Sequence, residues 1–405
     1  MKILRVIASM NPESGGPCQG IRNTIPAMKE HGVTNEVVCM DSPDSEWLGK
    51  DDFEIYALGP AENPWKYSSK LIPFLMENAP KYNAIIAHGM WLFADYAVSH
   101  TMRKLKRNAA NTQNLPKWYI MPHGMLDPYF QKSPERRLKA IRNTIYWKLI
   151  EHKVVASADG LLFTSSEEMK LASQPFRPYR PVKEINVGYG IQEPPAASSA
   201  LSEAFFADYP ELRDRTFILF LSRIHAKKGL DLLIDAYESL CGGYGAADLP
   251  WLVIAGPNLD STFGRACVKK AKENPLLNKR IVFTGMLTGD KKWGAFHTCS
   301  AFVLPSHQEN FGIAVAEALA CSKPVLITDK VNIWREIQEG GAGIVKEDSV
   351  EGVRELLDIW LKRNRSEIDH MERSAVEVYR NHFEINQAIK KLMEVVSGTI
   401  ENGHD

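Results

Sequence analysis

The segment AFVLPSHQENFGIAVAEALACSKPVLIT, residues 301–328, contains two glutamates whose placement suits the binding of hydroxyl groups. An apolar run predicts a buried strand, a polar loop follows, and Gly312 begins a predicted helix. Glu309 stands just before this helix and Glu317 lies inside it. Because like charges repel, two carboxylates are not phosphate ligands, whereas their oxygens accept hydrogen bonds from sugar hydroxyls.

The start of the same helix is a predicted phosphate site. Around Asn310, Phe311 and Gly312, backbone N–H groups lack acceptors within the helix, and the helix dipole is positive there. We therefore expect a diphosphate at this helix end. A structural interpretation stays open, in which Glu309 caps the helix and Glu317 lies on a solvated face, since acids are favoured near helix starts.

A cationic pair precedes this segment in LSRIHAKKGLDLLIDAY, residues 221–237. Arg223 and Lys228 stand at a predicted strand-to-helix turn, where fixed cations can neutralise a diphosphate without a metal ion. Lys227 competes with Lys228, and the spacing before the following glycine favours Lys228. A plain basic surface loop is the alternative. No D-x-D metal motif occurs in the sequence, so no metal is expected.

Two loops of the first half could complete such a site. In SMNPESGGPCQGIRNTI, Gly15 and Gly16 would let a ligand approach the backbone closely, although a plain turn is the alternative. This loop lacks G-x-G-x-x-G, which disfavours a dehydrogenase. In MPHGMLDPYF, His123 follows a predicted strand and is expected to face the ligand rather than to serve only as a structural hydrogen-bonding group. His88 and Asp127 are weaker candidates.

These residues would be positioned by parallel sheets. Short, nearly continuous apolar runs alternate with amphipathic stretches, which is typical of strands covered by helices on both faces. The fold class predicted is α/β, with two Rossmann-like doubly wound domains and ligands at the carboxyl ends of the strands. The expected strands are 2–8, 35–40, 53–58, 83–89, 117–124 and 160–165, then 216–222, 250–256, 280–285, 301–306, 323–328 and 342–346.

The predicted domain boundaries follow a change of composition. Residues 190–212 are rich in Pro, Ala and Ser and are interpreted as a linker. The expected organisation is therefore an N-terminal domain over 1–190, a linker over 191–212, a second domain over 213–378 and a closing helical segment over 379–405. Whether that last helix closes the second domain or returns to the first is left open.

Composition excludes several classes of protein. The chain has 405 residues, 44% of them hydrophobic, with 49 basic and 49 acidic residues and no net charge. This balance disfavours a dedicated nucleic-acid-binding protein. Its six cysteines match no zinc spacing and predict reduced core residues of a cytoplasmic protein. No apolar window predicts a membrane span or a signal peptide.

The motifs together resemble glycosyltransferase family 4, which is retaining and has the two-domain GT-B fold. The resemblance rests on E-N-F-G-I-A-V-A-E, on Arg223 and Lys228, and on the glycine loop, and it is strongest over 215–345. It implies a metal-independent hexosyltransferase of polysaccharide biosynthesis whose two domains face each other across a cleft. The implied donor is a UDP-sugar such as UDP-glucose, with a GDP-sugar as the other choice, and the implied acceptor is a saccharide or a lipid-linked saccharide.

The resemblance also implies individual roles. Glu309 would bind the transferred sugar and Glu317 the ribose, while His123 would lie near the anomeric carbon. The amides from Asn310 to Ile313 would face the sugar and phosphates, and the main chain at Met286 would read the base. The implied catalytic set is His123, Arg223, Lys228 and Glu309, and the donor-binding set is Gly15, Gly16, Arg223, Lys228, Met286, Glu309, Asn310, Phe311, Gly312, Ile313 and Glu317.

Other functions remain to be distinguished. A nucleotide-sugar epimerase or hydrolase would use the donor without an acceptor, and a non-catalytic sugar-binding protein would not turn it over. The basic stretch 131–155 has an apolar stripe of Leu138, Ile141, Ile145 and Leu149. We expect this stripe to pack on the sheet; the alternative is a docking face for an anionic lipid-linked acceptor or for an anionic membrane, such as the inner face of the cell membrane.

Overall fold

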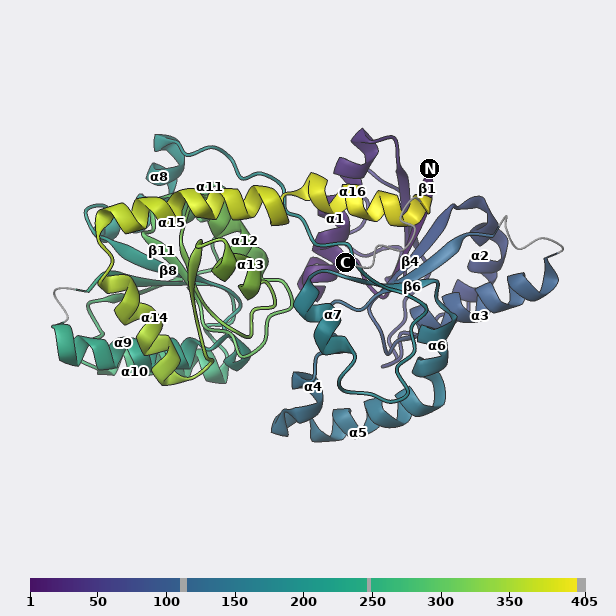
Figure 1. Cartoon of the computed structure of the whole chain (residues 1–405), viewed down its shortest axis with the longest axis horizontal. Helices are drawn as coiled ribbons and strands as arrows, with labels where there is room; N and C mark the ends of the chain where they lie inside the picture. Colours follow the sequence, from purple (N-terminus) through teal and green to yellow (C-terminus); the bar gives the residue numbers. More distant parts are fainter. Residues whose placement is uncertain (110–114, 246–248, 399–405) are drawn as a thin grey trace. The chain divides into compact units, whose positions relative to one another are not determined.

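The computed structural model describes residues 1–109, 115–245 and 249–398, and the chain divides into two compact units. Unit 1 comprises Met1–Gly190 together with the C-terminal segment from Ile385, and unit 2 comprises Ile191–Glu384. Each unit has its own parallel sheet with helices on both faces, which confirms the predicted α/β fold class (Figure 1).

Unit 1 has a seven-stranded parallel sheet in the order β3-β2-β1-β4-β5-β6-β7. Chain order reverses between β1 and β4, so the loops that follow these two strands flank a topological switch point. One short strand, β7, is absent from the sequence prediction. The strands are β1 (Lys2–Ile7), β2 (Thr34–Cys39), β3 (Ile55–Ala57), β4 (Ala84–His88), β5 (Lys117–Met121), β6 (Gly160–Phe163) and β7 (Glu184–Asn186).

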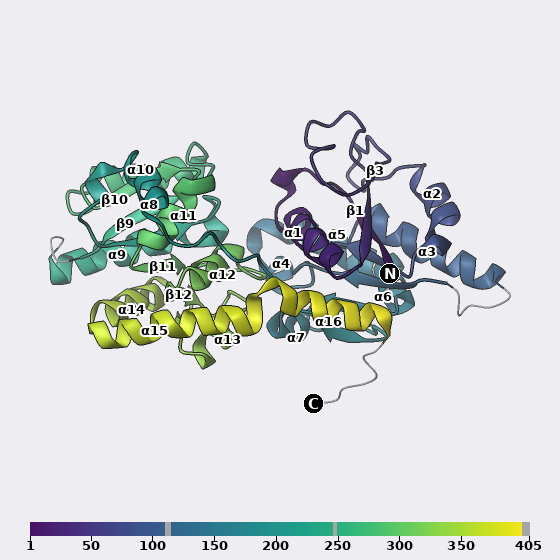
Figure 2. The same ribbon diagram turned by 90° about the horizontal axis from the view of Figure 1, so that it is seen from above.

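Alternate residues of these strands serve two cores, one on each face of the sheet. Leu4, Ile85 and Trp118 pack beneath one group of helices, whereas Ile3 and Ile86 pack beneath α1 and α16. Figures 1 and 2 show α1 and α16 side by side. The helices of unit 1 are α1 (Gly16–Glu30), α2 (Leu71–Asn78), α3 (Phe93–Asn108), α4 (Tyr129–Lys132), α5 (Arg137–Tyr146), a π-helix (Trp147–Glu151), α6 (His152–Ser157), α7 (Ser166–Ala172) and α16 (Ile385–Ser397).

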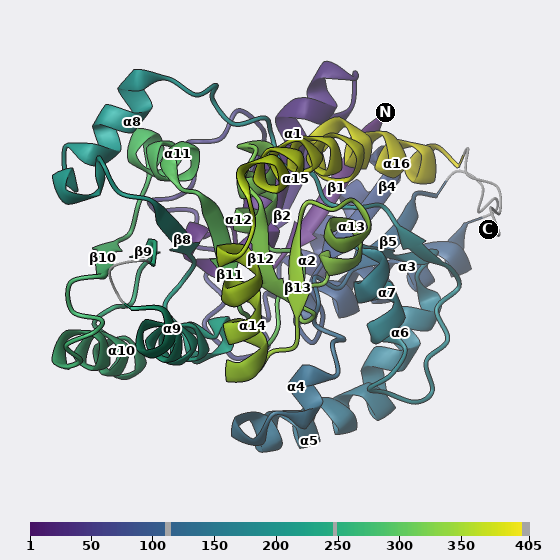
Figure 3. The same ribbon diagram turned by 60° about the vertical axis from the view of Figure 1, so that its left-hand side comes forward.

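Unit 2 has a six-stranded parallel sheet in the order β10-β9-β8-β11-β12-β13. Its switch point lies between β8 and β11, which are neighbours in space although three strands apart in the chain. Figure 3 shows the strands of this sheet, with β11 beside β12. The strands are β8 (Phe217–Leu221), β9 (Trp251–Ala255), β10 (Ile281–Gly285), β11 (Ala301–Leu304), β12 (Val325–Thr328) and β13 (Gly343–Lys346).

Two layers of helices cover this second sheet. In Figure 1, α11, α12, α13 and α15 lie on one face, and α9, α10 and α14 lie on the other. The helices are α8 (Ser199–Phe206), α9 (Leu230–Tyr244), α10 (Thr262–Glu273), α11 (Gly289–Thr298), α12 (Ile313–Ala320), α13 (Trp334–Glu339), α14 (Val350–Leu361), α15 (Arg365–Val378) and a π-helix (Tyr379–Phe383). No helix within the described part of the chain has the length and apolar character that crossing a bilayer requires.

The predicted linker belongs to unit 2, and the closing segment, of which residues 379–398 are described, is divided between the two units. Residues 191–212 carry α8, which packs on α11, so most of the expected linker is a structural part of unit 2. The closing helical segment divides at Glu384, whose backbone is extended and whose N–H bonds to Tyr379. The following helix α16 buries Ile389 and Leu392 against the sheet of unit 1.

The expectation for the stripe of 131–155 is wrong. Leu138, Ile141, Ile145 and Leu149 do not pack on the sheet; all four side chains are exposed. The residues that fasten this stretch to unit 1 lie on its opposite face, where Asn143, Trp147 and Glu151 are buried. Apolar periodicity identified the correct helix but the wrong buried face.

Candidate active site

The loops that follow β8 and β11 bring the predicted cation Lys228 and the predicted acid Glu309 of unit 2 together. Since these strands are neighbours in a parallel sheet, their carboxyl ends meet at one edge, at the switch point where α/β sheets bind ligands. The N–H of His307 donates to the carbonyl of Lys227 across 2.9 Å, which ties one loop to the other. The predicted phosphate and sugar ligands are therefore neighbours.

Lys228 and Glu309 form an ion pair between these loops. Both side chains are largely buried, with 8% and 20% of their surfaces exposed. Burial by itself would raise the pKa of Glu309, but the charge and hydrogen bond of Lys228 outweigh it, so the pKa lies below its usual value. Glu309 is therefore an anion at neutral pH, and its oxygens accept hydrogen bonds.

The backbone of Glu309 is fixed as firmly as its side chain. Its N–H donates to Lys330 and its carbonyl accepts from the N–H of Asn332, each at 2.9 Å. These two bonds form an isolated parallel bridge between Glu309 and Val331. Thus a segment that follows β12 holds the loop that follows β11, and the carboxylate is preorganised.

Two glycines make this arrangement sterically possible. Gly229 has a φ of +67°, and a Cβ atom there would lie 1.9 Å from the carbonyl oxygen of Pro305. Gly312 has a φ of +83° and is the N-cap residue of α12. Both conformations are costly for residues with a side chain. The first glycine permits the two loops to approach, and the second turns the chain so that α12 begins beside Glu309.

Glu317 forms an ion pair that no sequence pattern predicts. Nζ of Lys292, on α11, lies 2.6 Å from Oε1 of Glu317. Burial raises the pKa of Glu317 above its usual value, and Lys292 opposes that shift without cancelling it. The alternative of a solvated Glu317 is wrong, because only 14% of its side chain is exposed.

The remaining predicted donor ligands differ in exposure. Arg223 is exposed at the end of β8, and Met286 is 68% exposed just after β10. Phe311 is buried and packs edge-to-face on Phe383, with ring centroids 5.5 Å apart, so only its main chain can meet a ligand. Lys227 bonds to Gln308 at 2.5 Å, while Lys228 takes the position beside Glu309. Asn310 lies two residues before Gly312, the N-cap residue of α12, and Ile313 is the first residue of that helix.

In unit 1, His123 contacts His88 at the carboxyl ends of the neighbouring strands β4 and β5. Nδ1 of His88 lies 3.0 Å from Nε2 of His123, and the two rings are stacked. Arg5, buried on β1, approaches Nε2 of His88 at 3.4 Å and donates to Asn35 at 2.9 Å. The three residues Arg5, His88 and His123 line one cavity of unit 1.

This arrangement determines the tautomers of both rings. A guanidinium has only donors, so Nε2 of His88 must accept from Arg5. Nδ1 of His88 then carries the proton and donates to Nε2 of His123, which leaves Nδ1 of His123 as an N–H donor. Burial lowers the pKa of His123 to about 3, with Arg5 adding to the effect, so the imidazole is neutral.

The loop that carries His123 is held by Glu168. Oε1 of this buried carboxylate accepts from the N–H of Gly124 at 2.5 Å, and Oε2 accepts from the N–H and hydroxyl of Thr164. Ser165 caps α7 by accepting a hydrogen bond from the N–H of Glu168. His123 itself has a φ of +52°, and these bonds hold the loop in that conformation.

The other first-half candidates have clear local settings. Gly15 has a φ of +90°, which explains a glycine there, whereas at Gly16 a Cβ atom would meet nothing within 4 Å. The structure thus gives no steric reason for the second glycine. Asp127 accepts from the N–H of Tyr129 at 2.8 Å and lies at the start of α4.

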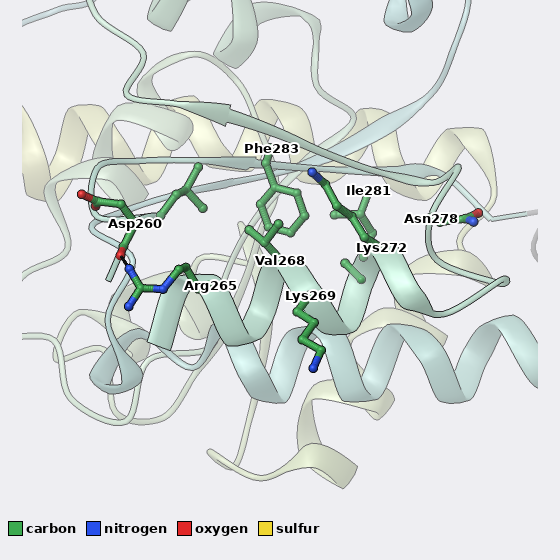
Figure 4. A pocket seen from close by; sticks show the side chains of 10 residues that line it. Asp260, Arg265, Val268, Lys269, Lys272, Asn278, Ile281 and Phe283 are labelled. Carbon is green, nitrogen blue, oxygen red and sulfur yellow. Dashed lines mark hydrogen bonds between the residues drawn. The ribbon is translucent and has the colours of Figure 1, made fainter. Parts of the chain in front are cut away.

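A separate pocket in unit 2 contains none of the predicted ligands. It lies between the edge strand β10 and helix α10 (Figure 4). Arg265, Lys269 and Lys272 line it together with Val268 and Phe283, and the guanidinium of Arg265 donates to the carbonyl of Asp260. This pocket does not enter the site described above.

Sequence reasoning missed the supporting residues Lys292, Arg5 and Glu168. Each contacts a predicted ligand, or the loop that holds one, from a distant part of the chain. A buried charge in an apolar strand is the one available signal, and Arg5 within KILRVIA provides it.

The chain is similar to known proteins in sequence. Residues 202–377 match the model of the family described as glycosyl transferases group 1. The chain is 25% identical over 216 residues to the O-antigen chain mannosyltransferase C of Escherichia coli, covering 52% of this chain and 53% of that protein. It is 30% identical over 125 residues to the mannosylfructose-phosphate synthase of Agrobacterium fabrum, covering 30% and 27%. The chain thus spans about half or less of these curated relatives.

Solved structures resemble the chain over nearly its whole length. HepE of Anabaena, in complex with UDP and glucose, has a TM-score of 0.72 at 15% identity and covers 98% of this chain and 100% of its own. A glycosyltransferase from Rickettsia africae has a TM-score of 0.74 at 16% identity, with 99% of each chain covered. Such identities show the fold alone. The family match over 202–377, the relatives and these neighbours together support a glycosyltransferase similar to the group 1 family, and the chain has the GT-B fold.

Proposed function

We propose that the protein is a retaining, metal-independent hexosyltransferase that moves a hexose from a nucleotide sugar to a saccharide or lipid-linked saccharide. The observation that carries this proposal is the buried Lys228–Glu309 pair beside the start of α12, at the switch point of unit 2. It combines a cation and helix amides suited to a diphosphate with a carboxylate suited to sugar hydroxyls.

In this mechanism the acceptor oxygen forms a bond to the anomeric carbon as the bond to the diphosphate oxygen breaks. The leaving nucleoside diphosphate takes the electron pair, and its phosphate oxygen accepts the acceptor's proton. Lys228, Arg223 and the amides at the start of α12 stabilise the developing negative charge. Glu309 positions the sugar, Glu317 the ribose, and no protein nucleophile is required.

His123 has a compatible role. We assign it the donation of its Nδ1 proton to a hydroxyl or ring oxygen of the donor sugar, because its other nitrogen already accepts from His88. A neutral imidazole that cannot readily be protonated is suited to positioning by a hydrogen bond rather than to general acid catalysis.

The donor is proposed to be a UDP-hexose, with a GDP-hexose as the competing choice. The structure of HepE contains UDP and glucose, which supports the first, whereas several relatives are mannosyltransferases, which makes mannose the competing sugar. Thermal-shift measurements with UDP-glucose, GDP-mannose and ADP-glucose test the proposal. We expect one nucleotide sugar, and its free nucleoside diphosphate, to raise the melting temperature; no shift with any of them contradicts it.

A second assay separates transfer from its rivals. The protein is incubated with the donor identified by thermal shift, first alone and then with a mixture of oligosaccharide acceptors. We expect release of the nucleoside diphosphate only when an acceptor is present. An epimerised sugar without acceptor would assign an epimerase, free sugar released as fast as with acceptor would assign a hydrolase, and binding without turnover would assign a sugar-binding protein.

A further inference from the structure

Helix α5 and the following π-helix expose a row of large apolar side chains. Leu138, Ile141, Ile145 and Leu149 have 84%, 58%, 54% and 63% of their surfaces exposed. Their spacing of three and four residues places them along one side of the helix. Isolated exposed apolar residues are common, but a contiguous row of this kind indicates a binding surface.

The opposite side of this helix is firmly packed. Trp147 is 1% exposed and stacks on Phe176, with ring centroids 4.9 Å apart. Nε1 of Trp65 donates to the hydroxyl of Tyr146 at 2.9 Å. The helix is therefore anchored by its other face, and rotation to bury the row would break these contacts. Figures 1 and 3 show α5 at the periphery of unit 1.

Cations flank the apolar row on both sides. Arg137 and Lys148 border one edge of the row in the helical projection, Lys139 and Arg142 border the other, and Lys153 follows in α6; all five are exposed. Among the side chains described between 136 and 155, the one carboxylate is Glu151, which is fully buried. Burial, with Asp95 beside it, raises the pKa of Glu151 well above its usual value, so it does not offset the cations.

We propose that this surface, defined by Leu138, Ile141, Ile145, Leu149 and the five flanking cations, docks unit 1 on an anionic membrane. The helix would lie in the plane of the interface, with the apolar row among the acyl chains and the cations at the lipid headgroups. Two copies of the chain meeting through this surface would bring their cations together, and a neutral apolar partner would leave them unused. An anionic lipid surface satisfies both features.

Flotation with lipid vesicles tests the proposal on the full chain. We expect binding to vesicles of phosphatidylcholine with phosphatidylglycerol, little binding to phosphatidylcholine alone, and weaker binding as salt rises. The variant Leu138→Gln/Ile145→Gln should lower the partition coefficient at least about tenfold. Arg142→Gln/Lys148→Gln should weaken binding to anionic vesicles by a comparable factor.

Matched controls separate this surface from general stickiness. Val182, 63% exposed elsewhere in unit 1, provides the apolar control Val182→Gln, and the exposed cations of α3 provide Lys104→Gln/Arg107→Gln. Both controls should bind vesicles like the unchanged protein, and melting curves verify that every variant folds. The proposal is overturned if the unchanged protein ignores anionic vesicles, if the row variant binds as well as its control, or if the row instead mediates dimerisation in sedimentation experiments.

Discussion

Nδ1 of His88 donates to Nε2 of His123 across 3.0 Å, at the carboxyl ends of the neighbouring strands β4 and β5. With Arg5 on the far side of His88, this contact fixes both tautomers. In this Arg5–His88–His123 relay, the Nδ1–H of His123 is available to donate a hydrogen bond to a ligand. Arg5 and His88 are in this sense positioning residues for the proposed donor-sugar contact.

The first prediction concerns that tautomer. In ¹⁵N–¹H NMR spectra of histidine-labelled protein, His123 should appear as the neutral Nδ1–H form and His88 as the same form. Replacing His88 by Phe removes the donor to Nε2, so His123 should then populate both tautomers. An Nε2–H form of His123 in the unchanged protein contradicts the relay. His370, exposed on helix α15 of unit 2, gives an internal reference for a solvent-exposed ring.

The second prediction is a pH dependence of stability. The folded pKa of His123 is about 3, against about 6.5 in the unfolded chain, and that of His88 is also well below 6.5. The unfolded state therefore binds more protons between these values, so the stabilisation present above pH 6.5 is lost as pH falls toward about 3. Urea unfolding at about pH 7.5 and about pH 5 should show this loss, and His123→Gln should reduce it. If His123→Gln leaves the change in unfolding free energy between these pH values unaltered, groups other than His123 cause it.

The third prediction concerns the sugar carboxylate. Glu309→Gln keeps the shape but weakens the acceptor, so turnover should fall about a hundredfold while the affinity for the free nucleoside diphosphate changes little. Glu317→Gln, on the helix α12 that follows Glu309, is the matched variant and should instead weaken nucleotide binding through the ribose. Mass spectrometry with a slow donor analogue provides the control on mechanism: a sugar covalently attached to Glu309 contradicts the front-face attack proposed here.

The fourth prediction concerns the approach of the two loops. Gly229→Ala should destabilise the protein by about 2 kcal/mol or more, because its Cβ atom would meet Pro305 and its φ is positive. Gly242→Ala is the control, since it lies in helix α9 with nothing within 4 Å of the added Cβ atom, and should stabilise by about 0.5 kcal/mol. Denaturant unfolding compares them; equal effects would refute the steric argument.

The sequence predicted the site residues in the loops after the strands better than it predicted the distant residues that contact them. Glu309, Lys228 and His123 each lie in a loop that follows an apolar strand, and the carboxyl ends of parallel strands must share an edge, so local patterns were sufficient to place them there. The pairs Lys292–Glu317 and Arg5–His88 join residues far apart in the chain, and no local pattern encodes such contacts.

Two further differences have physical causes. Strand β7 is only three residues long, Glu-Ile-Asn, too short and polar to produce a strand pattern. The row on α5 has the periodicity of a core-facing helix, and periodicity reports which residues share a side but not what covers them. The buried side of the helix is instead the side of Trp147 and Glu151. A hydrophobic pattern would not select Glu151 as a buried residue.

Lys228 is proposed to bind the diphosphate of a nucleotide sugar. Calorimetric titration measures this contact through the affinity of the protein for free nucleoside diphosphates. UDP and GDP are titrated into the unchanged protein, Lys228→Met and the adjacent control Lys227→Met. For the nucleotide that binds, we predict at least about a tenfold loss of affinity in Lys228→Met, the value of a charge-assisted hydrogen bond, and little loss in Lys227→Met. Equal affinities for the unchanged protein and Lys228→Met, with both folded, would contradict the account.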